Sequence, residues 1–113
     1  MQRELGFSGA TLFALDDDYI YFYDGSTQAI RKASRDIQTD PEPAISNVSM
    51  PAMIVADGGE VFWIDKASKA IMVGDAGAPR ELVSSAGANS IDVDANGVYW
   101  SSAESDQILK YAR

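Results

Sequence analysis

Ile91–Lys110 reads IDVDANGVYWSSAESDQILK, and it aligns without a gap with two earlier stretches of this 113-residue chain. These are Phe13–Lys32, FALDDDYIYFYDGSTQAIRK, and Ile54–Val73, IVADGGEVFWIDKASKAIMV. Each copy has an apolar start, an aspartate, a turn, a triplet of one apolar and two aromatic residues, and an isoleucine near its end. A strand-rich repeat of roughly 40 residues is typical of the blade of a β-propeller, in which four-stranded sheets surround a channel.

Alternation of apolar residues and turn signals divide each copy into three strands. A fourth strand is expected after the first two copies, at Ala44–Val48 and Glu81–Ser85. The strands expected within the copies are Leu12–Leu15, Tyr19–Tyr23, Ala29–Ala33, Met53–Ala56, Glu60–Ile64, Ala70–Gly74, Ser90–Val93, Val98–Ser101 and Gln107–Tyr111.

The phase of the repeat indicates a split blade. The third copy is followed by no fourth strand, while Arg3-Glu4-Leu5 near the N-terminus echoes Arg80-Glu81-Leu82 in the fourth strand of the second copy. We therefore expect one unit over residues 1–113. It consists of a lone fourth strand in 1–9, complete blades at 10–48 and 49–86, and the first three strands of the split blade at 87–113.

The predicted fold class is all-β, with three four-stranded propeller blades per chain. Closed propellers typically have four to eight blades, and unpaired strand edges promote association. Identical subunits in head-to-tail contact commonly form closed rings. We therefore expect a homodimer that forms a six-bladed propeller, in which the N-terminal strand of each subunit completes the last blade of the other. A nine-bladed trimer and a fragment of a longer polypeptide are alternatives, and a β-sandwich explains the period poorly.

The amino-acid composition disfavours several classes of function. The chain has no cysteine and no histidine, so it lacks the usual thiol nucleophile, the commonest general base and the commonest zinc ligand. Its formal charge is −8, and its cations are scattered, which disfavours binding to nucleic acid or to anionic membranes. No apolar run approaches the roughly 20 residues that span a bilayer. The N-terminal MQRELGFSG lacks the apolar core of a secretory signal, and no cellular compartment is predicted.

The aromatic triplets carry a family resemblance. Tyr99-Trp100-Ser101-Ser102 in the third copy corresponds to Phe62-Trp63-Ile64-Asp65 in the second and to Tyr21-Phe22-Tyr23-Asp24 in the first. This pattern, preceded by an aligned aspartate and followed by the isoleucine, resembles the YWTD-type repeat of low-density-lipoprotein-receptor propellers. NHL-type blades fit almost as well. The aspartate at the fourth position of the YWTD motif is present in two of the three copies, and the threonine at its third position is present in none. The resemblance implies a six-bladed propeller and implies little about function, because propellers host many activities.

The aligned aspartates Asp16, Asp57 and Asp94 have two interpretations. They could form a ring of carboxylates that binds a cation, or each could cap its turn by accepting backbone N–H bonds. Their presence in every copy favours the caps. The run Asp16-Asp17-Asp18 does not have the spacing of a calcium-binding loop, so we expect a solvated turn there. No metal and no cofactor is predicted.

The aromatic residues and the connecting segment are expected to have structural roles. The aromatic residues of the second strands are expected to form core between blades. The segment Ala33–Pro43 is expected to be an exposed connector, although loops on rigid scaffolds often carry recognition. Neither a Gly-x-Ser-x-Gly elbow nor a phosphate-binding glycine loop is present.

The channel mouth is the best place to look for a ligand site. The segments that enter the first strands, Gly9–Thr11, Met50–Ala52 and Ala88–Ser90, lie near this mouth in a propeller. We expect a non-enzymatic binding or scaffold module that recognises a protein or a small ligand there. The alternatives are a calcium-dependent hydrolase or lactonase and a propeller fragment without independent function. The candidate ligand-binding residues are Asn89, Ser90, Asp92 and Thr11.

Overall fold

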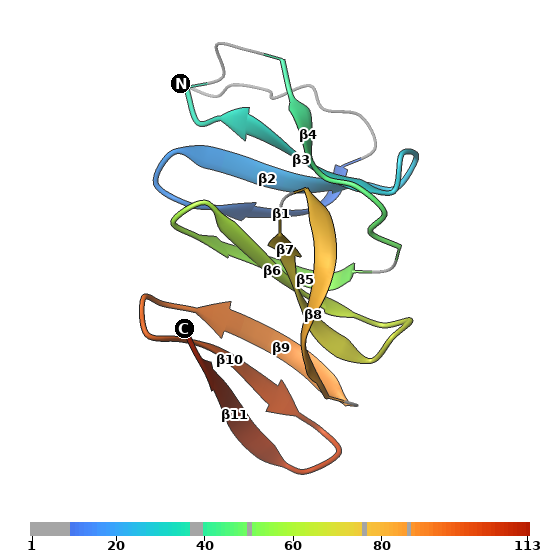
Figure 1. Ribbon diagram of the computed structural model, residues 1–113, viewed down its shortest axis with the longest axis vertical. Helices are drawn as coiled ribbons and strands as arrows, with labels where there is room; N and C mark the ends of the chain where they lie inside the picture. Colours follow the sequence, from blue (N-terminus) through green and yellow to red (C-terminus); the bar gives the residue numbers. More distant parts are fainter. Residues whose placement is uncertain (1–9, 37–39, 50, 76, 86) are drawn as a thin grey trace.

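The computed structural model describes residues 10–36, 40–49, 51–75, 77–85 and 87–113, with backbone only at positions 10 and 11. These residues form eleven antiparallel strands in three sheets and contain no helix (Figure 1). Within each sheet the strands follow chain order. The strands are β1 (Ala10–Leu15), β2 (Tyr19–Asp24), β3 (Ala29–Ser34) and β4 (Glu42–Ile45) in the first sheet, β5 (Pro51–Asp57), β6 (Glu60–Asp65), β7 (Ala70–Asp75) and β8 (Ala78–Ser84) in the second, and β9 (Ala88–Val93), β10 (Gly97–Ser102) and β11 (Gln107–Ala112) in the third.

The all-β prediction and the nine strands predicted within the three copies are confirmed, with small extensions at their ends. The fourth strands begin earlier than predicted, and the prediction of Ala44–Val48 is wrong because β4 ends at Ile45. Asn47 has a left-handed φ of 62°, and the backbone N–H of Ser46 donates to the carbonyl of Gly77 in the second sheet, 3.0 Å away. The chain thereby leaves the ladder at Ser46 and Asn47, and it returns at Val48, whose N–H donates to the carbonyl of Gln28 over 2.8 Å. The strand expected around Arg3–Leu5 lies outside the described residues.

The connector predicted at Ala33–Pro43 is shorter than expected at both ends. Ala33 is buried within β3, and Pro43 belongs to β4. Between them, Arg35, Asp36 and Asp40 are exposed, as an external connector requires.

The three copies also share a residue with left-handed backbone conformation. Gln28, Lys69 and Asp106 occupy the same place in the hairpin between the second and third strands, and all three have φ between 53° and 56°. Such left-handed residues close the longer β-hairpin loops. The carboxylates of Asp24 and Asp65 begin two of these hairpins and accept N–H bonds from the residues two positions on, at 3.0 and 2.9 Å. Asp24 and Asp65, which correspond to the last residue of the YWTD motif, are therefore turn caps.

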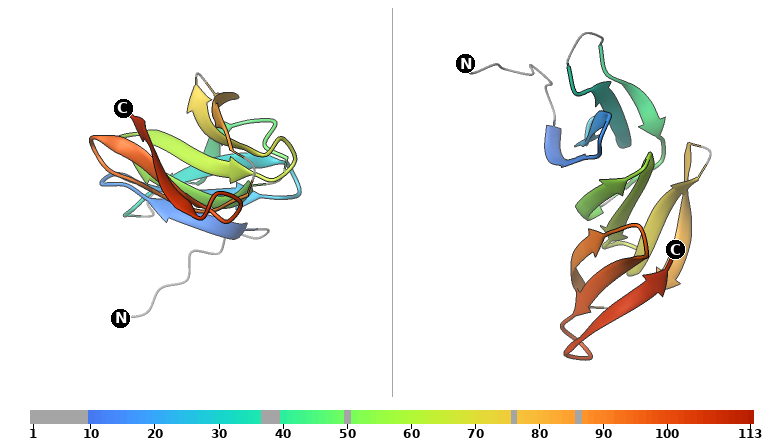
Figure 2. Two further views of the ribbon diagram at one scale, coloured as in Figure 1. Left: turned by 90° about the horizontal axis from the view of Figure 1, so that it is seen from below. Right: turned by 90° about the vertical axis from the view of Figure 1, so that its left-hand side faces the viewer.

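The three sheets follow one another along the long axis of the molecule, and the right-hand view of Figure 2 shows the same order. The main contacts between sheets join the first strands, because β1 contacts β5, and β5 contacts β9, which also contacts β6. The opposite edges of the two four-stranded sheets are β4 and β8. The sheets thus pack most closely along their first strands.

Two apolar clusters fill the spaces between the sheets. The aromatic residues predicted as core supply much of both, and Trp63, at 1% exposure, is among the most buried side chains. Tyr99 is the exception, since it is only half-buried. The buried residues between the first and second sheets are Tyr21, Tyr23, Ile30, Ile45, Val48, Ile54, Val61 and Trp63. Those between the second and third sheets are Phe62, Ile64, Ile71, Val73, Ile91, Val98 and Trp100.

Candidate functional site: the open faces of the end sheets

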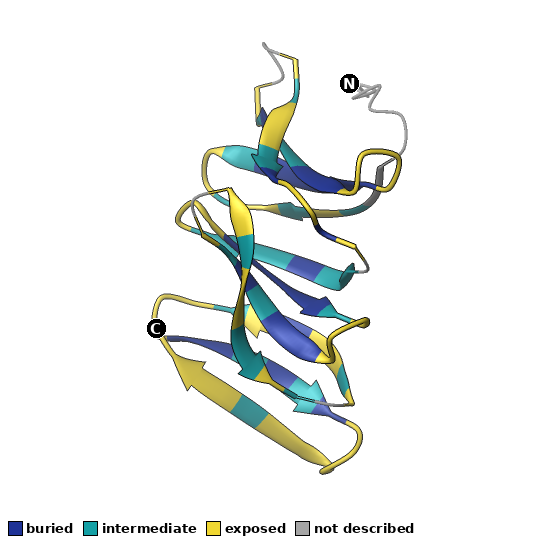
Figure 3. Cartoon of the chain, turned by 45° about the vertical axis from the view of Figure 1, so that its right-hand side comes forward, coloured by how far each residue is buried: buried dark blue, intermediate teal, exposed yellow. Residues whose placement is uncertain are grey.

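The identical isoleucine of the repeat reveals an uncovered surface. Ile30 and Ile71 are 0% exposed, whereas Ile108, at the same place in the third sheet, is 80% exposed. Ile30 packs toward the second sheet and Ile71 toward the third. The equivalent face of the third sheet is not covered by another sheet of the described residues, and β11, which leads to the C-terminus, is almost wholly exposed (Figure 3).

Strand register defines this face, which we name the third-sheet face. Ser101 pairs with Ile108 and Ser90, and Tyr99 pairs with Asp92 and Lys110, so their side chains share one side of the sheet. The other side packs against the second sheet through Val98 and Trp100, among others. The third-sheet face consists of Ser90, Asp92, Tyr99, Ser101, Ile108 and Lys110.

The opposite end of the molecule has a matching surface. Phe13 is 70% exposed, although its counterparts Ile54 and Ile91 are only 5% and 3% exposed because each packs against the preceding sheet. Leu15, two residues along the same strand, is 46% exposed. Phe22, which pairs with Phe13, is itself buried. We name the exposed pair Phe13 and Leu15 the first-sheet face.

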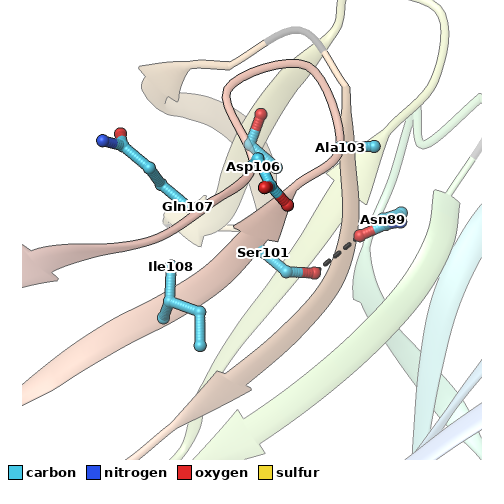
Figure 4. A pocket seen from close by; sticks show the side chains of 7 residues that line it. Asn89, Ser101, Ala103, Asp106, Gln107 and Ile108 are labelled. Carbon is cyan, nitrogen blue, oxygen red and sulfur yellow. Dashed lines mark hydrogen bonds between the residues drawn. The ribbon is translucent and has the colours of Figure 1, made fainter.

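Two adjoining recesses lie on the third-sheet face. The larger has a volume of about 450 Å³ and is lined by Asn89, Asp106 and Gln107, among others (Figure 4). The smaller, of about 190 Å³, includes Ser90 and Asp92. Ser101 and Ile108 line both recesses.

The structure thus brings together three of the four candidate residues predicted from sequence, namely Asn89, Ser90 and Asp92. Thr11 belongs to β1 in the first sheet, at the other end of the row of sheets, and its side chain lies outside the described part. It therefore does not share a recess with the other three within one chain.

Asn89 owes its position to a β-bulge. Ser101 pairs with Ser90 while Ser102 pairs with Ala88, which leaves Asn89 as the extra residue. The Ser101 hydroxyl donates to Asn89 Oδ1 over 2.6 Å (Figure 4). The second sheet has the same irregularity between Pro51 and Met53, where the extra residue is Ala52. Bulges re-aim side chains, so the repeat places an amide here in the third sheet where the second has only a methyl group.

Polar groups line this region together with one exposed apolar side chain. A hydroxyl, an amide and the carboxylates of Asp92 and Asp106 surround an exposed isoleucine. In the described ranges there is no group of three His, Cys, Asp or Glu side chains placed to hold a metal ion. The described part of the chain also has no helix of the length and hydropathy needed to cross a lipid bilayer.

The aligned aspartates serve structure, as their repetition suggested. Asp16 Oδ1 accepts the N–H groups of Asp18 and Tyr19 at 2.9 and 2.8 Å. Asp94 Oδ1 accepts those of Asn96 and Gly97 at 2.8 and 3.0 Å. Both are therefore turn caps.

Two of these aspartates, Asp16 and Asp57, also contact a neighbouring sheet. Asp16 Oδ2 accepts the Tyr21 hydroxyl and also the N–H of Gly59 in the second sheet, 3.0 Å away. Asp57 differs, because its turn uses Gly58 and Gly59 at positive φ while its carboxylate contacts Arg113 of the third sheet.

These caps make stability depend on pH. The N–H of Asn96, followed by that of Gly97, lowers the pKa of Asp94. Partial burial acts to raise the pKa of Asp16, but its four hydrogen bonds outweigh burial and leave the pKa lowered. A carboxylate whose pKa is lower in the folded chain stabilises the fold above its unfolded pKa, near 3.9, and loses that contribution as pH falls through the folded value.

We therefore expect the urea midpoint to be level between about pH 7 and 5 and to fall below about pH 4. Circular dichroism during urea titration at each pH measures it. The matched variant Asp16→Asn/Asp94→Asn keeps an acceptor in both turns but cannot titrate there, so its midpoint is expected to fall less steeply. Parallel acid profiles for the two proteins contradict the role of the caps.

Two arginines hold equivalent positions that sequence reasoning missed. Arg35 and Arg113 each lie five residues after the identical isoleucine. Arg35 Nη1 donates to the carbonyl of Asp16 at 3.1 Å, and Arg113 Nη1 donates to that of Asp94 at 2.8 Å. Their backbone N–H groups also donate to equivalent carbonyls, those of Asp18 and Asn96. Extending the three-copy alignment by three residues would have revealed the pair.

No protein-family model matches the chain, and no curated protein matches it in sequence. What the chain does must therefore be inferred from its own residues and geometry.

Proposed function

We propose that the three sheets are blades of a β-propeller, and that two copies assemble head to tail into a six-bladed ring. This ring is a binding or scaffold module without catalysis, and it recognises a protein or small ligand at the mouth of its channel. The observation that carries the proposal is Ile108, which is 80% exposed at a position where Ile30 and Ile71 are 0% exposed.

The interfaces inside the chain provide the template for assembly. Each joins the face that bears the identical isoleucine to the face that bears the counterpart of Phe13. The third-sheet face and the first-sheet face are one of each kind, and both expose apolar side chains. A second copy can repeat the same packing at both ends, and a twofold axis then closes the ring. Six blades lie within the usual range of propellers, whereas three do not.

The outer edge of the third sheet supports exchange of a strand. β3 and β7 each pair on both sides, whereas β11 pairs only with β10 among the described residues. We propose that the N-terminal segment of the partner subunit pairs with β11. Its sequence Arg3-Glu4-Leu5 matches Arg80-Glu81-Leu82 of β8, which pairs with β7.

The ligand is proposed to bind beside the first strands. β1, β5 and β9 contact one another in turn, so they line the channel in a closed ring. Asn89 and Thr11 hold aligned positions at the start of these strands, and twofold symmetry brings each into the ring twice. Ser90 and Asp92 follow on β9. Hydroxyl, amide and carboxylate groups at such a rim suit a polar ligand or a protein loop.

Sedimentation velocity over a range of concentrations, with and without calcium chloride, tests the proposal. We expect a species of twice the 12.2 kDa chain mass and a melting temperature that calcium leaves unchanged. A monomer at every concentration contradicts the ring, and three times the chain mass favours the nine-bladed trimer. A rise in melting temperature with calcium favours the calcium-dependent hydrolase, because a ligand of the native state stabilises it.

A further inference from the structure

We infer that Arg35 of one subunit pairs with Asp94 of the partner subunit across the ring interface, and that this ion pair fixes how the two copies align. The inference rests on the proposed head-to-tail dimer and names the contact that directs it. It follows from a bridge that the chain already makes between its own second and third sheets.

That internal bridge is Arg113. Its Nη1 lies 2.5 Å from Asp57 Oδ2, and its Nη2 lies 2.6 Å from Glu60 Oε1. The guanidinium carbon also lies 5.3 Å from the centre of the Phe62 ring. The Arg113 side chain is 17% exposed, whereas Asp57 and Glu60 are 44% and 52% exposed, so the bridge lies at the surface with its arginine packed inward. Arg113 thereby ties the third sheet back to the preceding one.

Arg35 occupies the position in the first copy of the repeat that Arg113 occupies in the third. It shares with Arg113 both its place after the isoleucine and its two backbone anchors. Unlike Arg113, Arg35 has no carboxylate of the described residues within ion-pair distance. The difference has a simple cause, since the described residues place a preceding sheet beside Arg113 and none beside Arg35.

The third sheet and its first turn carry the complementary groups. Asp94 and Tyr99 stand at the positions that Asp57 and Phe62 hold in the second sheet. If a partner's first sheet packs there as the third packs on the second, its Arg35 meets a carboxylate and an aromatic ring. The position of Glu60 is occupied by Gly97, so one ion pair forms where Arg113 makes two. Lys110, whose ammonium lies 5.5 Å from the Tyr99 ring, is exposed and can turn into solvent.

This charge match commits the face to a second copy of the chain. The recesses on the third-sheet face could in principle receive any protein of suitable shape. The first sheet, however, presents Phe13 and Arg35, which correspond to Ile91 and Arg113. The third sheet presents Ile108 and Asp94, which correspond to Ile71 and Asp57, the groups that Ile91 and Arg113 meet inside the chain. Complementary charges of this kind set register and suppress incorrect partners.

The test compares Arg35→Glu with the matched variant Arg80→Glu. Arg80 is an exposed arginine of β8 that pairs with Asp75, so the control makes the same charge change away from both end faces. Dilution in analytical ultracentrifugation measures the dimer Kd. Because each ring contains the pair twice, we expect Arg35→Glu to raise Kd by about a hundredfold or more, and Arg80→Glu to leave it nearly unchanged.

A double-mutant cycle identifies the partner. Asp94→Asn keeps the acceptor that caps its turn and removes the charge, and Asp57→Asn is its counterpart within the chain. We expect Arg35→Gln and Asp94→Asn each to raise Kd by about tenfold, and the two together to raise it little further. Asp57→Asn is expected to lower thermal stability without an effect on Kd.

The outcomes separate this inference from the proposed function. A wild-type monomer overturns the ring and the pair together. A wild-type dimer whose Kd responds equally to Arg35→Glu and Arg80→Glu keeps the ring and overturns the pair. A dimer in which Arg35→Gln and Asp94→Asn act additively overturns their contact. Circular dichroism confirms that each variant is folded.

Discussion

Phe13→Asp and Ile108→Asp are each expected to convert the dimer into a folded monomer, and an equimolar mixture of the two variants is expected to form a dimer again. Each change buries an uncompensated carboxylate in the ring, which costs about 3–5 kcal/mol per site, or roughly two to three and a half decades in Kd for each site. In the mixed dimer both lesions can share one interface. The other interface is then formed by an unaltered first-sheet face and an unaltered third-sheet face.

This mixing experiment separates head-to-tail contact from its alternatives. A symmetric contact between two first-sheet faces predicts that Phe13→Asp dissociates the dimer while Ile108→Asp does not. The matched control is Ala78→Asp, which adds the same charge at an exposed position of β8 and is expected to leave the dimer intact. Light scattering after size-exclusion chromatography measures all four samples. If the mixture stays monomeric, the ring arrangement is wrong.

Ile71→Ala is expected to destabilise the monomeric Phe13→Asp protein by about 2–5 kcal/mol, the usual cost of truncating a buried isoleucine. Ile108→Ala in the same background is expected to change stability by less than about 0.5 kcal/mol, because its side chain is already in water. Urea denaturation followed by tryptophan fluorescence measures both. In the wild-type background, where the third-sheet face is proposed to be covered, Ile108→Ala should instead weaken the dimer.

Equal costs for the two isoleucines in the monomer would contradict the exposure difference on which the proposal depends. Ile30→Ala provides a second reference, since Ile30 is also 0% exposed and lies in the other interface within the chain. The three substitutions are chemically identical and occupy one position of the repeat. Any difference between them therefore reports on neighbours in space.

Most strands could be predicted from the sequence because their signals are local. The aromatic triplets, the Asn96-Gly97 turn and the aspartates at the turns mark strand ends without reference to distant residues. β4 was misplaced because its end depends on Asn47, whose left-handed φ accompanies a contact between Ser46 and the second sheet. Such a contact leaves no mark in the alternation of apolar residues.

The candidate site could be predicted only in part. The sequence predicts Ser90 and Asp92 on one strand and Asn89 in the segment that enters it, and the structure puts the three in adjoining recesses. The bulge that presents Asn89 and the exposure of Ile108 were not visible, because aligned isoleucines at the same place in the other two copies are buried. Arg113 was missed for a related reason. Its significance lies in Asp57 and Glu60, which are more than fifty positions away in the chain. The likeness to YWTD-type or NHL-type repeats stays a prediction.

Because the sheets pack along their first strands, closure of the proposed ring depends on the angle between neighbouring sheets. Each sheet must rotate from its neighbour by about a sixth of a turn for two three-sheet chains to complete a circle. A smaller or larger rotation would leave the two end faces of a pair unable to meet, and the same contacts would then propagate as an open helical fibre. The side chains between the sheets, Trp63 among them, therefore determine more than stability. By setting the rotation between sheets they would decide whether the proposed ring closes at two subunits.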